Sequence, residues 1–284
     1  MIGRDVTVRG YRAEAGRLLT GPVRIGAEAF VGDAALLDIG TALGDGAELG
    51  HVSALLDGQA VPAGQSCAGV PAIPCLTRFR TLPQGRVGVP RAALFTAFQL
   101  GWWLLAAGPT TLMLTAAAIV GYGRVAPDAS DVPSVAASLS DLPTLLGITA
   151  ALFVGSIAAN LLRVLVVPRI AWRFLQAGRI YRIYGLRHFM LRAVTANSNS
   201  PFFNLLFGDS SAIVHYLRAV GYRFPGLRQT GSNFGVQQRH DVPFLCEFGS
   251  GTMVSDDLVM ANADFSNATF KLGMIRFGQD NFLG

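Results

Sequence analysis

The chain has 284 residues and a formal net charge of +5, and Lys271 is its only lysine. Arginines cluster beside apolar segments and no recognition motif accompanies them, so we expect no nucleic-acid partner. The three cysteines, Cys67, Cys75 and Cys246, include no C-x-x-C pair. The sequence therefore predicts no disulfide framework and no metal site, and we interpret all three as packing residues.

Apolar residues recur every six positions near the N-terminus: Ile25, Val31, Leu37, Leu43, Leu49, Leu55 and Val61. Several residues that follow them, such as Gly32 and Gly44, are small enough for a tight corner. This spacing is typical of the hexapeptide repeat, in which each unit makes one short strand and one corner. It predicts a left-handed β-helix over residues 1–76, with residues 10–21 protruding as a loop.

Two uncharged segments follow a Pro/Gly/Arg linker over residues 77–91. Arg91 and Arg124 enclose 32 residues without a formal charge, and Asp141 and Arg163 enclose another 21. A hydrocarbon core of about 30 Å needs about 20 residues. We therefore predict a transmembrane helix pair over residues 92–168, with an outside loop over 124–141. A pair of buried core helices is the alternative.

The charges around these segments predict their orientation. The predicted loop is acidic, whereas both flanks are rich in arginine. The positive-inside rule then places both flanks in the cytoplasm. The prediction is a multi-pass protein of the inner (plasma) membrane, with the lipid bilayer as a partner and both β-helix segments cytoplasmic.

The remainder of the chain divides into two predicted regions. Residues 169–220 interleave aromatic and arginine residues, which is typical of interfacial and linking helices. Residues 221–284 return to a six-residue phase at Met253, Val259, Phe265, Phe277 and Leu283. This predicts the start of a second β-helix domain, truncated within its repeat. The predicted fold class is thus mixed, with left-handed β-helix segments flanking a two-helix transmembrane hairpin.

Several segments resemble a known family. They are Leu49–His51, Val61–Gly64, Gly69–Ala72, Pro201–Asn204, Leu206–Ser211, Gln229–Gly235, His240–Cys246, Gly251–Asp256 and Asn281–Gly284. Together they resemble the C-terminal membrane region of the ε-poly-lysine synthetase family of nonribosomal peptide synthetase-like proteins. Asp257 departs from the family pattern, and the H-H-x-x-x-D-G motif of conventional condensation domains is absent.

The resemblance implies a function and partners. Such synthetases alternate transmembrane pairs with tandem hexapeptide-repeat, condensation-like domains that join amino acids through amide bonds. This chain would then meet a carrier domain bearing aminoacyl-phosphopantetheine, and the adjacent tandem domains of the same protein. Phosphopantetheine and ATP would be used by domains outside the chain, and no cofactor is expected within it.

Amide formation on a thioester needs a base and a polarised carbonyl, and histidine is the side chain best matched to neutral pH. His51, on a predicted corner, is our first candidate. His240 with Asp241 is the second. Candidate substrate-binding residues are Thr230, Ser232, Asn233, Asn262 and Asp264. All of these residues also suit purely structural roles at corners and turns.

Three functions remain open on the sequence. The first is a membrane-anchored condensing module that transfers a carrier-bound aminoacyl group to an amine. The second is a non-catalytic membrane scaffold of such a synthetase. The third is a membrane-bound hexapeptide-type acyltransferase that uses acyl-CoA or an acyl carrier.

Overall fold

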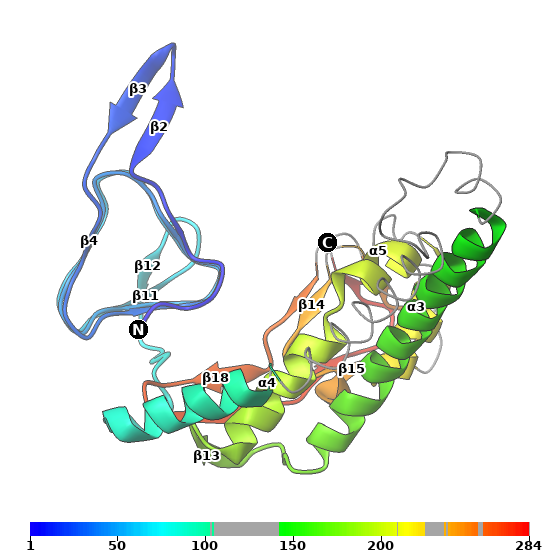
Figure 1. Cartoon of the computed structure of the whole chain (residues 1–284). Helices are drawn as coiled ribbons and strands as arrows, with labels where there is room; N and C mark the ends of the chain where they lie inside the picture. Colours follow the sequence, from blue (N-terminus) through cyan, green and yellow to red (C-terminus); the bar gives the residue numbers. More distant parts are fainter. Residues whose placement is uncertain are drawn as a thin grey trace, which may run out of the picture. The chain divides into compact units, whose positions relative to one another are not determined.

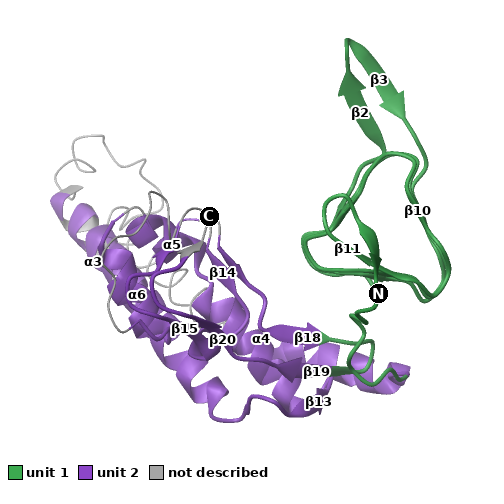
Figure 2. Cartoon of the chain, turned by 180° about the vertical axis from the view of Figure 1, so that it is seen from behind, with its two compact units in different colours: residues 1–85, 265–269 green, residues 86–264, 270–284 purple. Residues whose placement is uncertain are grey.

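The computed structural model describes residues 1–102, 104, 142–208, 210–224, 236, 238–254 and 258–283. The chain forms two compact units (Figure 2). Unit 1 comprises Met1–Gly85 with Phe265–Thr269, and unit 2 comprises Arg86–Asp264 with Phe270–Gly284.

Short strands repeat every six residues along unit 1. They are β4 (Arg24–Ile25), β5 (Phe30–Val31), β6 (Leu36–Leu37), β7 (Ala42–Leu43), β8 (Glu48–Leu49), β9 (Ala54–Leu55) and β10 (Ala60–Val61). Each pairs in parallel with a strand eighteen residues away, so that Val31 lies beside Leu49.

Three sheets result from this pairing. Three further strands join these sheets: β1 (Thr7–Val8), β11 (Ser66–Ala68) and β12 (Ile73–Cys75). The strand orders of the three sheets are β1-β6-β9, β10-β7-β4 and β12-β11-β8-β5. β12 is antiparallel to β11. The chain traces a three-sided outline in Figure 1.

The repeated apolar residues of unit 1 form its core. Val31, Leu37, Leu43, Leu49, Leu55 and Val61 are all at most 4% exposed. These six residues of the repeat therefore face the inside of unit 1. Ile25 is the exception at 36% exposure.

The glycines after the repeated residues are required by close packing between successive corners. A Cβ atom on Gly32 would lie 2.4 Å from the backbone nitrogen of His51. One on Gly44 would lie 2.6 Å from the nitrogen of Ala63. The corners leave no room for a methyl group, which explains the residue type at these positions.

The segment predicted to protrude is a β-hairpin (Figure 1). β2 (Tyr11–Glu14) and β3 (Arg17–Thr20) are antiparallel, and Ala15 and Gly16 between them both have positive φ, as a two-residue hairpin turn requires. Arg12 ties the hairpin to the sheets through Asp38 at 3.1 Å and Asp57 at 3.3 Å.

Unit 2 contains helices and short strands. Residues 89–102 are helical. The other described helices are α3 (Leu142–Trp172), α4 (Leu186–Ser198), α5 (Pro201–Gly208), α6 (Ala212–Val220) and the 3₁₀ turn η1 (Pro243–Leu245). Gly221 ends α6 with φ 135°, a backbone conformation that favours glycine.

The strands of unit 2 form small sheets. They are β13 (Ile180–Arg182), β14 (Arg239–His240), β15 (Cys246–Phe248), β16 (Met253–Val254), β17 (Val259–Met260), β18 (Ala263–Phe265), β19 (Thr269–Leu272), β20 (Ile275–Phe277) and β21 (Phe282–Leu283). The sheets are β13-β19-β18, β14-β17, β15-β20 and β16-β21.

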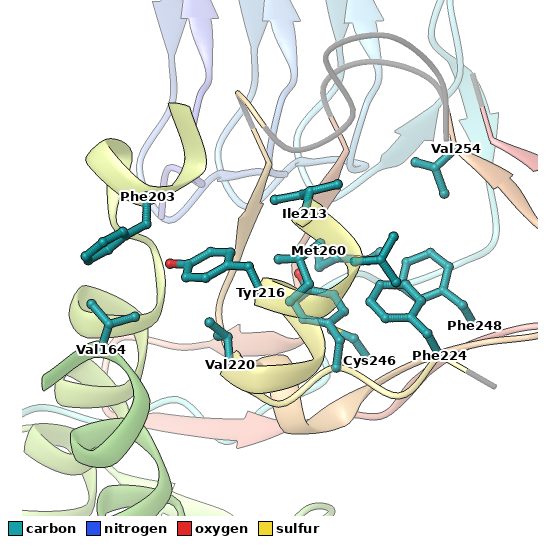
Figure 3. Packing of buried hydrophobic residues seen from close by; sticks show 13 residues of the cluster. Val164, Phe203, Ile213, Tyr216, Val220, Phe224, Cys246, Phe248, Val254 and Met260 are labelled. Atoms are coloured by element: carbon teal, nitrogen blue, oxygen red, sulfur yellow. The ribbon is translucent and has the colours of Figure 1, made fainter. Parts of the chain in front are cut away.

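One face of α3 packs on the core of unit 2. Val164, from α3, is 1% exposed, and the cluster continues through Phe203 of α5 to the buried face of α6. Figure 3 shows these side chains meeting Cys246 and Phe248 of β15 and Met260 of β17. Cys67 and Cys246 are buried in the two cores, which confirms their predicted packing role.

The repeat phase predicted for the C-terminal region is wrong. Met253 and Val259 are 42% and 53% exposed, whereas Val254 and Met260 are each 1% exposed. The buried phase is displaced by one residue, and successive residues of a strand point to opposite faces. The offsets between paired residues also vary, since Arg239 pairs with Val259 and Cys246 with Ile275.

The predicted fold class is also wrong. The described strands fall into eight small sheets, both parallel and antiparallel, rather than into left-handed β-helix segments flanking a two-helix hairpin. A six-residue spacing predicts where strands and corners lie, but not how strands pair. In unit 2 helices α4 to α6 and varying pairing offsets replace a regular coil.

The multi-pass localisation is corrected as well. Among the described residues a single helix segment, Thr149–Trp172, is long and apolar enough to cross a membrane. One such segment in the described part of the chain does not support the predicted multi-pass protein of the inner membrane with two cytoplasmic flanks. Residues 105–141, which include most of the predicted first span and the outside loop, lie outside the described residues.

Substitution of Gly32 tests the close packing of the corners. We expect Gly32→Ala to lower the free energy that local unfolding of unit 1 requires by about 1–3 kcal/mol. The added methyl group would clash with the backbone of His51. Native-state hydrogen exchange of unit 1 amides measures this energy. Gly10→Ala is the matched control, since nothing lies within 4 Å of its added Cβ. Equal protection in the two variants would contradict the packing account.

Candidate functional site

His51 lies on a corner of unit 1 and accepts a backbone hydrogen bond. The amide N–H of Asp33 donates to His51 Nδ1 at 2.9 Å. Asp45 does the same one corner earlier, where its Oδ1 accepts the amide N–H of Ala27 at 2.7 Å. His51 thus shares a structural role with an aspartate at the equivalent corner.

This contact determines the tautomer of His51. Because an N–H group donates to Nδ1, the neutral ring carries its proton on Nε2. The ring then has no lone pair left to accept a proton from a substrate amine. The Asp33 carboxylate lies 3.9 Å from Nδ1, beyond hydrogen-bond distance, and its Oδ1 accepts the amide N–H of Arg4. His51 is exposed but is not arranged as a general base.

His240 is the centre of a buried hydrogen-bond chain in unit 2. Its Nε2 lies 2.8 Å from Ser198 Oγ, and its Nδ1 lies 2.9 Å from the hydroxyl of Tyr222. Gln238 Nε2 donates to the same hydroxyl at 2.8 Å, and Ser198 Oγ donates to the carbonyl of Val194 at 2.7 Å.

One assignment of protons satisfies this whole chain. Tyr222 donates to Nδ1 of a neutral His240 ring, and Nε2–H donates to Ser198. The ring is 4% exposed, and burial lowers the pKa of His240 to about 3. Burial likewise raises the pKa of Tyr222 well above its ordinary value. His240 therefore joins elements of the fold and is closed to a substrate.

Asp241 is not oriented toward the His240 ring, whose partners are Ser198 and Tyr222. One oxygen of its carboxylate, Oδ2, accepts the amide N–H of Ala263 at 3.0 Å. The backbone carbonyl of Asp241 accepts a hydrogen bond from Thr195 Oγ1 at 2.8 Å. The two residues are adjacent in sequence, but they do not form a catalytic dyad.

The structure divides the predicted substrate-binding residues. Asn262 is 4% exposed, and its side-chain amide bonds both backbone groups of Val242. Asp264 is exposed on β18. Thr230, Ser232 and Asn233 lie outside the described residues. Within unit 2 the structure thus brings His240, Asp241 and Asn262 into one neighbourhood, as structural residues, whereas His51 belongs to unit 1.

A cavity in unit 2 is lined mainly by arginine side chains. It has a volume of about 720 Å³ and is lined by Arg91, Arg173, Phe174, Gln176, Arg179, Ile180, Tyr181, Arg182, Gly185, Leu186 and Arg187. Five of these side chains are guanidinium groups, and no acidic residue is among them. Among the described residues, none of the five arginines has a carboxylate within ion-pair distance.

The walls of this arginine-lined cavity are fixed by hydrogen bonds. The hydroxyl of Tyr181 accepts the amide N–H of Gln176 at 2.9 Å, and the amide N–H of Gly178 donates to the carbonyl of Leu272 at 2.8 Å. Arg91 Nε donates to the carbonyl of Tyr184 at 3.1 Å. The Arg187 guanidinium lies 5.0 Å from the centre of the Tyr181 ring.

The sequence alone does not predict this cavity. The arginines are conspicuous in the sequence, but there they appear as the flank of an apolar segment. The cavity forms because Arg91, β13 and the start of α4 converge from separate parts of unit 2. Among the described residues, no group of three histidine, cysteine or acidic side chains is placed to hold a metal ion.

Comparisons with known proteins add no assignment. No model of a protein family matches the sequence, and no curated protein matches it.

The buried His240 ring predicts acid-sensitive stability. Its pKa is about 3 in the fold against an ordinary value of 6.5, so between these values only the unfolded chain binds the proton. The unfolding free energy should therefore decrease as pH falls through this window. His188 acts in the same direction. Burial lowers the pKa of His188 to about 4, and the nearby charge of Arg192 adds to this effect.

We expect His240→Gln to lower the unfolding free energy at neutral pH by about 1–3 kcal/mol, because Tyr222 and Ser198 lose partners. The variant should also depend less on pH within the window. Denaturant titrations above and inside the window measure both effects. His215→Gln, at an exposed position of α6, is the control. An unchanged pH dependence in the His240 variant would be inconsistent with the buried neutral ring.

Proposed function

We propose that this chain is a membrane-associated, non-catalytic scaffold module of a nonribosomal peptide synthetase-like protein. The observation that carries the proposal is α3. Its segment Thr149–Trp172 is strongly apolar, and only 6% of its most apolar stretch is buried. A helix that belonged to the core of a water-soluble protein would bury most of such a surface.

The surface of α3 supports association with a lipid bilayer. Phe153, Val154 and Leu162 are each more than 60% exposed. Leaving apolar surface in water costs about 25 cal/mol per Å², and a bilayer removes this cost. The 24 residues of the segment extend about 36 Å, enough for a hydrocarbon core of about 30 Å. Arg163 and Arg169 lie in its C-terminal half, where long side chains reach the interface.

The contacts of the candidate histidines favour a scaffold over a condensing module. Catalysis by either ring would need a free lone pair directed at a substrate. His51 Nδ1 already accepts the amide N–H of Asp33, and both nitrogens of His240 are engaged in the buried chain. The same contacts disfavour a histidine-based acyltransferase.

The synthetase context rests on the resemblance of segments such as Pro201–Asn204 and His240–Cys246. In this proposal a carrier domain and adjacent domains of the same protein are the partners. ATP and phosphopantetheine are used by those domains. This chain would hold them beside the bilayer.

Charge placed on α3 tests the association with membranes. A lysine costs about 2.5–3.5 kcal/mol at the centre of a spanning helix and less toward its ends, so two adjacent lysines are introduced. We expect Phe153→Lys combined with Val154→Lys to lower recovery of the full chain with phospholipid vesicles by more than about tenfold. Flotation of the purified chain measures the bound fraction.

Leu18→Lys combined with Leu19→Lys is the control, because these exposed residues lie on the hairpin of unit 1. Hydrogen exchange of α6 amides verifies that unit 2 stays folded. Undiminished recovery of the α3 variant would refute membrane association through this helix.

A further inference from the structure

We propose that the arginine-lined cavity binds the phosphate group of a phosphoester with an apolar portion. This site goes beyond the scaffold role, because binding of a soluble phosphoester requires neither a bilayer nor a synthetase. The lipid headgroup and the soluble phosphoester share the same recognition chemistry.

The charge of the cavity identifies the ligand as an anion. Arg91, Arg173, Arg179, Arg182 and Arg187 all line it, and arginine stays protonated in proteins. Five like charges around one space repel one another. Elsewhere in the protein, arginines meet carboxylates: Arg12 bonds Asp38 and Asp57, and Arg276 bonds Glu247. The cavity arginines have no such partner among the described residues, so an external anion is the missing counter-charge.

The geometry of the donors favours phosphate. A guanidinium presents a planar fork of N–H groups that matches two phosphate oxygens, and several forks around one cavity can share the oxygens of one phosphate. Arg91 and Arg187 are already oriented by the Tyr184 carbonyl and the Tyr181 ring, which reduces the entropy lost on binding. Both therefore present partly ordered donors.

The size and remaining lining of the cavity indicate more than an inorganic ion. A volume of about 720 Å³ is within the range of small-molecule sites and exceeds the need of a phosphate alone. Phe174, Ile180 and Leu186 line it and are 50%, 51% and 59% exposed. These side chains offer apolar surface to the organic part of a phosphoester.

The position in the chain is compatible with both sources of phosphate. Arg173 directly follows the last residue of α3, so an acidic phospholipid bound beside that helix would place its headgroup toward the cavity. A soluble phosphoester would enter from water. The experiment separates these sources.

Binding is measured with the full chain in detergent and two kinds of probe. The soluble probe is hexyl phosphate, a phosphomonoester with an apolar chain, and its binding is followed by calorimetry. The lipid probe is phosphatidylglycerol in phosphatidylcholine nanodiscs, compared with phosphatidylcholine alone. Binding of either phosphate probe supports the site, and the probe that binds more tightly identifies the source. Failure of both probes to bind would overturn the proposal.

Variants link the binding to the cavity. Because three charge-assisted donors are lost, Arg179→Gln, Arg182→Gln and Arg187→Gln together should weaken binding by at least about 100-fold. The same positions changed to lysine keep the charge but lose the fork, and should weaken binding by about tenfold.

Arg17→Gln, Arg218→Gln and Arg223→Gln remove the same charge at exposed positions outside the cavity and should leave binding unchanged. If this control triple weakened binding as much as the cavity triple, net charge rather than the cavity would explain it, and the proposal would be wrong. If the unaltered chain bound neither phosphate probe but still floated with vesicles, this site alone would be refuted. If it bound a phosphate probe but did not float, the scaffold role alone would be refuted.

Discussion

The hydrogen bond between His240 Nε2 and Ser198 Oγ joins β14 to the last turn of α4. Two more contacts reinforce this junction: Asn199 bonds both backbone groups of His240, and Thr195 Oγ1 donates to the carbonyl of Asp241. The other end of α4 supplies Leu186 and Arg187 to the arginine-lined cavity, and the body of α4 packs against α3. The positions of the apolar helix and of the cavity therefore both depend on a buried polar network that is satisfied only while His240 stays neutral.

Side chains with structural roles differ from those suited to an external partner in whether the protein itself supplies their hydrogen-bond or ion-pair partners. The protein itself satisfies the candidate histidines: His51 accepts an amide N–H, and His240 has partners on both nitrogens. A buried polar group without a partner is costly, so such complete pairing indicates a role in stability. The cavity arginines and the exposed face of α3 are the opposite case. Among the described residues, no carboxylate lines the cavity, and no other segment buries the exposed face of α3. An anion and a bilayer would supply what is missing.

The sequence predicted local features of the fold better than its tertiary organisation. Apolar spacing located the buried residues from Val31 to Val61, because one short strand and one corner occupy each six residues there. The same period failed at Met253 and Val259, where strand partners lie at varying offsets and helices share the core. Residue type alone makes His51 and His240 candidate bases, but contacts distant in sequence engage their lone pairs. The cavity was missed because its lining comes from separate segments.

A role in positioning partners, without chemistry of its own, is tested most directly by the rate of amide-bond formation in the full-length gene product. His51→Asn keeps an acceptor for the amide N–H of Asp33 but removes the imidazole, and His240→Gln removes the ring that bonds Tyr222 and Ser198. With rates expressed per folded molecule, a scaffold predicts kcat within about twofold of the unaltered protein for both variants. A decrease of about 100-fold or more in either variant, the size expected for loss of a general base, would contradict it.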